Sequence, residues 1–407
     1  MPEEIQSINE PNLWRLETPG HAGWEHTASP GDPGHYLMVS ADSHCNEPAN
    51  LWYERIDAKY RDRLPHIETD ANGVKWQISE GWARSRLLDS NLEGEDKMRS
   101  RSGADPVERL RDMARDGVDA EIIFPNKGLT MWATLDHSFA EAQCRVYNDW
   151  AWEMFGPYND RMSPMAAIAT ADVGAAIEEI QRVAKLGFRG LTLPCKPIFG
   201  AHDARHLNYN LAAFDPMWAV IQEADLPITF HVSTGRDPRA ARKDGGAVIN
   251  YVSHSLVPTI EPIANLCGSG VVERFPKLKF GAIESGIGWV AWALDTMDEA
   301  YHKHHMWAFP KLKRLPSDYF RSNSFASFQE DRVGLDLAVK YDLVNNFLWA
   351  NDYPHHEGSW PHSVQAIERQ MGHLTNEQRA KILGLNAARV FNFDIEGLMA
   401  RRRPSVN

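Results

Sequence analysis

Short apolar segments alternate with segments of helical periodicity along most of this chain. Eight apolar segments have the length and the flanking Pro, Gly, Asn or Asp residues that are typical of buried strands. They are residues 36–42, 120–124, 164–169, 189–194, 227–231, 278–284, 320–326 and 347–352. Strand, helix and strand in repeated succession predict parallel pairing with the helices outside. The chain of 407 residues is therefore predicted to be an α/β protein, a distorted (β/α)8 TIM barrel.

Two connecting segments carry helix signals at both ends. Asp105 is a predicted N-cap, Pro106 follows at the first helical position, and apolar residues recur at helical spacing until Gly117. Residues 173–184 repeat this pattern before Gly187. Both segments are expected to cover the outside of the barrel.

The predicted barrel occupies residues 35–395 and leaves three segments outside the repeating pattern. Residues 1–34 are rich in Pro, Gly and charge, and they are expected to form an N-terminal arm. Residues 45–104 form a long insertion after the first strand, which predicts a lid over a pocket or, alternatively, a peripheral decoration. Residues 396–407 are predicted to be a C-terminal tail.

The composition argues against several classes of partner. With a formal net charge of -12, the surface would attract neither nucleic acid nor an anionic membrane. The four cysteines form no C-x-x-C pair, which indicates neither a disulfide framework nor a zinc knuckle. The longest apolar runs are shorter than the roughly 20 residues of a membrane span, and no signal-peptide pattern opens the chain. These features predict a cytoplasmic enzyme with a small-molecule substrate.

Three of the predicted strands end in side chains that bind metals. Asp42 and His44 share one face of the first strand, because side chains two residues apart point the same way. His231 ends the fifth strand and Asp352 the eighth. Each residue alone is more often a turn former or a satisfied polar group. In a parallel barrel, however, the strand ends converge on one face, so together they predict a site for one divalent metal ion.

Five motifs resemble the amidohydrolase superfamily, in particular the branch that includes aminocarboxymuconate semialdehyde decarboxylase and related aromatic-acid decarboxylases. The motifs are Ser40–His44 with Glu47-Pro48, Gly187–Gly190, Leu226–His231, Phe275–Lys279 before Glu284–Gly286, and Asn351–His355. The similarity covers residues 36 to 395. It implies a metal-bearing (β/α)8 barrel with Asp42, His44, His231 and Asp352 as ligands, and it also implies a homodimer.

The chain departs from this family pattern at two positions. Relatives often open with His-x-His, whereas Asp42 adds negative charge, which favours Zn or Mn without choosing between them. The decarboxylases place a catalytic His at the end of strand six, where this chain has Glu284. The identity of the acid or base therefore has to be argued from Glu284 itself.

Two reactions are compatible with such a site. In a decarboxylase, Glu284 would protonate the carbon that loses CO2, provided that desolvation keeps its carboxyl protonated. In a hydrolase, an ionised Glu284 would take a proton from water at the metal, or it would only orient a ligand. We predict non-oxidative decarboxylation of a carboxylated aromatic or ring-cleavage compound, with hydrolysis as the alternative and a non-catalytic ligand-binding barrel as a remote one.

Three further residues are candidates for the site. His254 is a second candidate acid or base, although a structural role fits its sequence equally well. Arg236 would suit a substrate carboxylate through a bidentate contact, or it is a solvated loop residue. His355 is placed to bind Asp352 or the substrate.

The N-terminal arm contains Trp14 and Trp24 in otherwise polar sequence. Such large apolar groups are seldom left in water without a use. They are expected to dock on the body or on a second subunit, which predicts a homodimer formed partly through the arm; a loosely ordered tail is the alternative.

Overall fold

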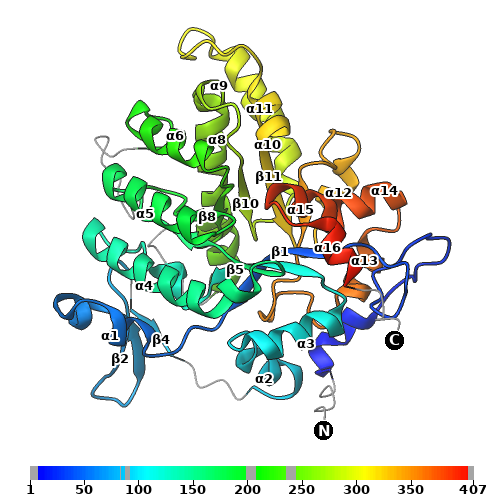
Figure 1. Cartoon of the computed structure of the whole chain (residues 1–407), viewed down its shortest axis with the longest axis horizontal. Coiled ribbons are helices and arrows are strands. Elements are labelled where there is room, and N and C mark those ends of the chain that lie inside the picture. Colours follow the sequence, from blue (N-terminus) through cyan, green and yellow to red (C-terminus); the bar gives the residue numbers. More distant parts are fainter. Residues whose placement is uncertain (1–7, 83, 88–91, 199–207, 235–243, 402–407) are drawn as a thin grey trace.

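The computed structural model describes residues 8–82, 84–87, 92–198, 208–234 and 244–401. Parallel strands lie at its centre, and helices surround them on the outside (Figure 1).

The central strands form two sheets. One has the order β1-β5-β6, and the other runs from β12 through β11, β10, β9 and β8 to β7. Every neighbouring pair within these two sheets is parallel. Their bounds are β1 Val39–Cys45, β5 Ala120–Pro125, β6 Met162–Pro164, β7 Ala166–Ala167, β8 Leu191–Leu193, β9 Ile228–His231, β10 Phe280–Ile283, β11 Ser324–Phe328 and β12 Phe347–Trp349.

Backbone hydrogen bonds join the two sheets into a ring. Between β6 and β7, the N–H of Met165 donates to the carbonyl of Ile123 at 2.9 Å, so these two strands are halves of one interrupted strand. At the other junction, the N–H of Asp352 donates to Asp42 O at 3.1 Å, and the N–H of His44 donates to Tyr353 O at 2.6 Å. The ring has eight strand positions, and the predicted TIM barrel is confirmed.

The helices end where the sequence signals indicate. Asp105 caps α3, because its carboxylate accepts from the N–H groups of Val107 and Glu108, and Gly117 ends the helix with a left-handed φ of 77°. The α-helices are α1 Leu51–Arg55, α2 Gly94–Arg101, α3 Pro106–Asp116, α4 His137–Phe155, α5 Val173–Leu186, α6 Asp215–Glu223, α7 Gly246–Ile249, α8 Ile260–Gly268, α9 Val271–Arg274, α10 Gly288–Lys303, α11 Pro316–Asn323, α12 Arg332–Ala338, α13 Ser363–Gln370, α14 Asn376–Ala380, α15 Asn386–Val390 and α16 Ile395–Ala400.

The short helical turns are a mixture of two kinds. The 3-10 turns are η1 Glu10–Leu16, η2 Ala58–Arg63, η3 Lys127–Thr130, η4 Gly156–Tyr158, η5 Ala212–Phe214 and η7 Val257–Thr259, and the π turns are η6 Asn250–Leu256 and η8 Lys381–Leu385.

Several predicted strand bounds differ from the structure, and the strands predicted at 36–42 and 320–326 differ most at their start. Residues 320–326 begin inside α11, and β11 starts only at Ser324. Tyr319 and Phe320 are buried on a helix face, so their apolar character does not come from a strand. The first strand runs from Val39 to Cys45 instead of 36–42, because it pairs with β5 as far as Pro125.

The barrel interior is apolar beneath the carboxyl ends of the strands. Buried residues of β1 and β5 contact side chains from α15, α16 and the turn between them. Among these, Phe391, Phe393 and Leu398 belong to the same cluster as Val39 and Ile122. Helix α16 begins at Ile395, so ordered structure continues into the segment predicted as a tail.

The described part of the arm packs on its own chain. Arg15 of η1 donates two hydrogen bonds, to Gly358 O at 2.5 Å and to His356 O at 2.6 Å. The Arg379 guanidinium lies 3.9 Å from the centroid of the Trp24 ring, while the Trp14 side chain is 46% exposed. The arm thus docks on the barrel, and its predicted role between subunits stays a prediction.

The insertion divides into two parts. Its antiparallel sheet of β2 His66–Thr69, β3 Lys75–Ile78 and β4 Ser85–Arg86 lies with α1 at one side of the barrel (Figure 1). Helix α2, by contrast, reaches the segment after β12, because Arg99 donates to His355 O at 2.7 Å. Helix α2 is thus the part of the insertion that contacts the segment after β12, and the role of the insertion as a lid stays a prediction.

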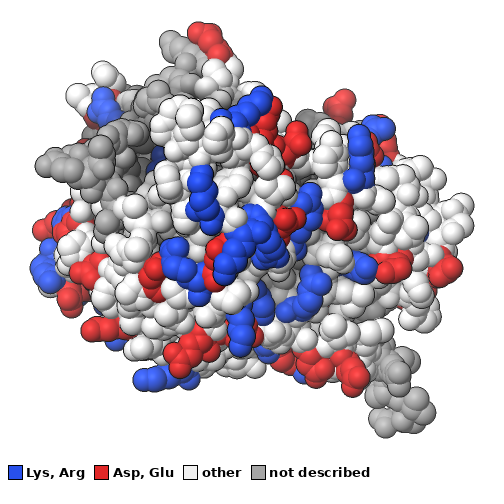
Figure 2. All heavy atoms as spheres, turned by 90° about the horizontal axis from the view of Figure 1, so that it is seen from above, with Lys and Arg blue, Asp and Glu red and all other residues white. Residues whose placement is uncertain are grey.

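The surface carries charges of both signs. Figure 2 shows Lys and Arg gathered near the middle of one face, with Asp and Glu among and around them. This face is not the uniformly cationic surface that a polyanion would bind. Among the helices that the structure describes, none combines the length and apolar composition that crossing a membrane requires.

Candidate metal centre

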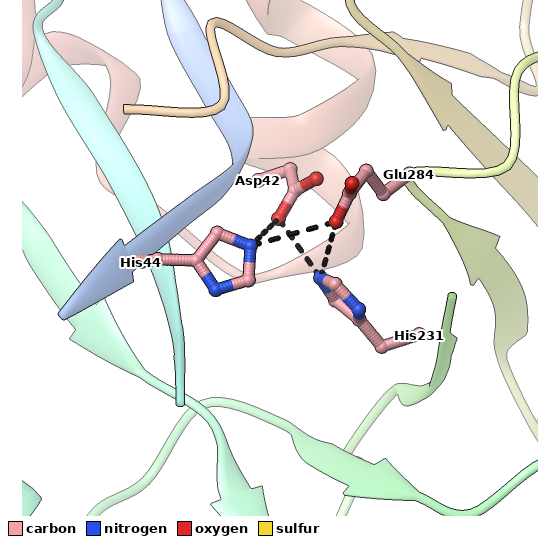
Figure 3. A group of neighbouring side chains, drawn as sticks. All are labelled: Asp42, His44, His231 and Glu284. Carbon is pink, nitrogen blue, oxygen red and sulfur yellow. Dashed lines mark hydrogen bonds and ion pairs between the residues drawn. The ribbon is translucent and has the colours of Figure 1, made fainter. Parts of the chain in front are cut away.

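Four buried side chains converge at the carboxyl ends of the strands. Asp42 and His44 come from β1, His231 ends β9, and Glu284 directly follows β10 (Figure 3). One ligand atom from each residue lies within 4.8 Å of the others. None of the four side chains is more than about 5% exposed, Glu284 at 5% being the most accessible.

The distances within this cluster leave room for a cation. His231 Nε2 lies 3.3 Å from both Asp42 Oδ1 and Glu284 Oε2. His44 Nε2 lies 3.5 Å from Asp42 Oδ1 and 3.6 Å from Glu284 Oε2. These separations are longer than the lengths of good hydrogen bonds. They match the distances between ligand atoms that each lie roughly 2.0–2.2 Å from one shared ion.

Both imidazoles are oriented by their other ring nitrogen. His44 Nδ1 donates to Pro125 O at 2.9 Å, and His231 Nδ1 donates to Val232 O at 2.9 Å. A carbonyl oxygen can only accept, so the proton of each neutral ring is on Nδ1. The Nε2 lone pairs therefore point into the cluster, as in metal-binding histidines.

Asp352 and His355 form the adjoining side of the cluster. Asp352 Oδ1 lies 3.5 Å from His44 Nε2 and 3.1 Å from His355 Nδ1. The His355 ring stacks on the His44 ring, and the two ring centroids are 4.0 Å apart. Both carboxylate oxygens of Asp352, together with His44 Nε2 and His355 Nδ1, are buried without a hydrogen-bond partner among the described residues. Because unpaired buried charges are costly, this donor set fits a bound cation.

Two cluster residues have a strained backbone. Glu284 has a φ of 57° and Asp352 a φ of 51°, in the left-handed region that costs a residue with a side chain about 1–2 kcal/mol. The Glu284 N–H donates to Ser327 Oγ at 3.0 Å, which helps to hold the turn. Such strain is typical of functional sites, where the surrounding fold enforces it.

The carboxylates of the cluster repel one another. Burial raises the pKa of Glu284 well above its usual range, and the charges of Asp352 and Asp42 raise it further. Burial likewise raises the pKa of Asp352, next to Asp42. For His44, burial lowers the pKa well below its usual range, which keeps the ring neutral. A divalent cation would relieve this repulsion and bind the neutral imidazole.

The structure thus brings most of the predicted site residues together. Asp42, His44, His231 and Glu284 form one group, and Asp352 and His355 form a second group with the same His44 and Glu284. Their roles in binding metal or in catalysis remain predictions.

Of the other two candidates, the structure describes only His254, which is not part of this cluster. His254 lies on η6, where its Nδ1 is 3.1 Å from Asn250 Oδ1, and it belongs to neither potential metal-binding group of the described chain. Arg236 lies outside the described residues.

Residues that the sequence did not single out complete the surroundings. Gln329 Nε2 lies 3.5 Å from Asp42 Oδ2, and His355 Nε2 donates to Asn126 Oδ1 at 3.3 Å. Asn126 directly follows β5, so the rule that picked out polar residues after strands would also have found it.

Glu47 fixes the segment that carries Asn126. Its buried carboxylate accepts hydrogen bonds from three consecutive backbone N–H groups: Asn126 at 2.9 Å, Lys127 at 2.9 Å and Gly128 at 3.1 Å. Glu47 thereby positions Asn126 against His355.

A buried ion pair supports the strand that carries Asp42 and His44. Arg109 pairs with Glu121, and it donates to His44 O and to Ser43 Oγ, both at 2.7 Å. Arg109 thus holds β1 at Ser43 and His44, next to the predicted ligand side chains.

Comparisons with known proteins agree with this geometry. A family model described as amidohydrolase matches residues 41–393. A curated relative, the gamma-resorcylate decarboxylase of Polaromonas sp., is 27% identical over 257 residues, which are 60% of this chain and 76% of that protein.

Solved structures share the fold. An amidohydrolase from Mycobacterium avium subsp. paratuberculosis has a TM-score of 0.70 at 20% identity and covers 88% of this chain and 99% of its own. The 5-carboxyvanillate decarboxylase of Novosphingobium aromaticivorans, in complex with manganese and 4-hydroxy-3-methoxy-5-nitrobenzoic acid, has a TM-score of 0.63 at 17% identity, covering 89% and 97%.

Proposed function

Because the chain belongs to the amidohydrolase family, we propose that it is a metal-dependent decarboxylase that removes a carboxylate from a hydroxylated aromatic acid. The observation that carries this proposal is the convergence of three carboxylates and two imidazole Nε2 atoms, with both oxygens of Asp352 lacking a hydrogen-bond partner in the described structure. The similarity to a gamma-resorcylate decarboxylase supports the substrate class.

We propose that Asp42, His44, His231 and Asp352 hold one divalent ion. When bound, this ion supplies a positive centre that attracts and polarises substrate oxygens. Two carboxylates make the ligand set rich in hard oxygen atoms, which suit manganese. Because a relative of the same fold also contains manganese, we favour Mn over Zn.

Glu284 is the proposed proton donor. In the reaction, the bond between the ring and its carboxylate breaks, CO2 leaves, and the electron pair remains on the ring carbon. That carbon then takes a proton from the Glu284 carboxyl. Glu284 is only 5% exposed, and burial by itself raises the pKa of this carboxyl, so burial favours the protonated form against the opposing charge of a bound ion.

Two further residues complete the proposed site. His355 is held by Asn126 beside Asp352, where it can donate to or accept from a substrate oxygen. Arg236 is proposed to bind a second carboxylate or a hydroxyl group of the substrate. Burial of the cluster excludes water from the proton transfer.

Hydrolysis is the second candidate function, favoured by one observation. Glu284 Oε2 lies within 3.3–3.6 Å of both imidazole Nε2 atoms, where an ionised carboxylate could take a proton from water.

Isotopes separate the two reactions. Manganese-loaded protein incubated with 2,6-dihydroxybenzoate in deuterated water should release CO2 and leave solvent deuterium on the product carbon. Incubation of a hydrolysable substrate in ¹⁸O-labelled water would instead place label in a new product carboxylate. The second result without the first would replace decarboxylation by hydrolysis.

We also propose that the protein works in the cytoplasm as a homodimer. The exposed face of Trp14 is available to a second subunit even though the arm packs on its own chain. Light scattering on a variant that starts at His35 should show weakened association. An unchanged mass at low concentration would remove the arm from the interface.

A further inference from the structure

A cavity of about 640 Å³ lies between the insertion and the segment that follows β5. The insertion contributes residues of α1, η2, β2 and β3, and the barrel contributes η3 and one residue of α4. Among the described residues that line this cavity, none is a proposed metal ligand. The cavity is therefore separate from the metal centre.

The cavity walls are mainly apolar and include two aromatic side chains. Trp52, Tyr53, Leu64 and Met131 contribute to them, and Ile67 stands at the rim with 63% of its surface exposed. Tyr53 is 60% exposed, so its ring borders the opening. Flat rings on the walls favour a planar aromatic ligand, which stacks on them at little entropic cost.

Two cations line the cavity, Arg61 and Lys127, against one acid, Asp62. The Arg61 guanidinium lies 5.6 Å from the centroid of the Tyr53 ring, and its Nε is buried without a hydrogen-bond partner in the described chain. No described carboxylate is within ion-pair distance of Arg61, whereas Arg63 pairs with both Glu80 and Asp136. Arg61 is thus a cation that an anionic ligand can still pair with.

We propose that this cavity is a second binding site, for an aromatic carboxylate that carries two rings or one ring with a large apolar substituent. Arg61 binds the carboxylate, and the apolar walls bind the body. The volume is within the range of pockets that enclose ligands of this size, whereas a single benzoate ring would leave most of it unfilled. The site requires neither the metal nor decarboxylation, so it stands independently of the proposed function.

The cavity shares one residue with the surroundings of the metal centre. Asn126 lines the cavity, and its side chain accepts a hydrogen bond from His355. The ligand would therefore bind on one side of Asn126 with the metal centre on the other.

Calorimetry with biphenyl-4-carboxylate on the manganese-loaded protein tests this proposal. Saturable binding is expected, with a loss of roughly tenfold in affinity for Arg61→Gln, because one charge-assisted contact is removed. Ala49→Trp, which places a large side chain at the lining, should weaken binding at least as much. The neutral analogue biphenyl-4-methanol should bind more weakly than the carboxylate.

Two controls keep the result specific. Arg111→Gln removes an exposed arginine on α3 that pairs with Glu108, and it should leave the affinity unchanged. Asp352→Asn alters the metal centre and should also leave it unchanged. If Arg61→Gln and Ala49→Trp bind biphenyl-4-carboxylate as tightly as the parent protein does, the proposal is overturned. Loss of binding in Asp352→Asn would also overturn it, and so would tighter binding of decanoate than of the biaryl acid.

Discussion

The metal centre and the cavity lined by the insertion meet at Asn126, which lines the cavity and contacts His355, yet they are built in opposite ways. The metal centre is buried, polar and strained, and its residues follow barrel strands whose backbone is hydrogen-bonded on both sides. The cavity is open and mainly apolar, and most of its lining residues come from the insertion, three of them (His66, Ile67 and Gln77) from the short antiparallel sheet at one side of the barrel. The strands of the barrel hold the side chains of the metal centre in place, whereas a surface insertion can vary and so change which ligands bind nearby.

The largest effect should come from removing a metal ligand. We expect His231→Ala and Asp352→Asn to lose tightly bound metal and nearly all turnover, because each leaves the remaining buried carboxylates without compensation. Metal analysis of the purified variants measures this. His254→Ala is the matched control, since His254 lies outside the cluster, and it should retain its metal. If both ligand variants bind as much metal as the parent, the proposed centre is wrong.

The next effect should come from the proposed proton donor. Glu284→Gln keeps the size and hydrogen-bonding capacity of the side chain but cannot transfer a proton, so turnover should fall by roughly 10²–10⁴ with metal content intact. Steady-state kinetics together with metal analysis separate the possible roles. Loss of metal would make Glu284 a ligand, and near-normal turnover would exclude it as the acid and leave His254 as the candidate.

A smaller effect is expected at the junction between the two regions. Glu47→Gln replaces a carboxylate that accepts three backbone N–H bonds, and it should lower the free energy of unfolding by about 1.5–3 kcal/mol. Urea unfolding measures the change. Glu68→Gln, at an exposed position of β2, is the control and should be nearly neutral. Equal stabilities of the two variants would show that Glu47 does not hold the segment.

The smallest effect is expected at the rim of the cavity. Ile67→Ala removes a side chain that is already 63% exposed, so stability should change by less than about 0.5 kcal/mol, with metal content and turnover unaltered. Thermal unfolding and activity assays test this. A large fall in turnover would instead show that the cavity and the metal centre are energetically coupled.

Much of the barrel could be predicted because its signals are local. The caps Asp105 and Gly117 act on their own helix, so the bounds of α3 followed directly from the sequence. The strand predicted at 320–326 begins too early, because Phe320 is apolar for another reason, burial on one face of α11. Apolarity reports burial, and over a short segment it does not report which element is buried.

Residue order alone shows which side chains stand at the strand ends, and in a parallel barrel this is enough to bring Asp42, His44, His231 and Asp352 to one face. The mutual arrangement of these side chains could not be read from that order. The left-handed backbone of Glu284 and Asp352, the stacking of His355 on His44 and the contact of Asn126 with His355 depend on packing between segments far apart in the chain. The cavity also depends on packing, because its walls come from segments that only folding brings together. Side-chain periodicity predicts which face of an element a residue occupies, but it does not predict the distance from that residue to its neighbours in the fold.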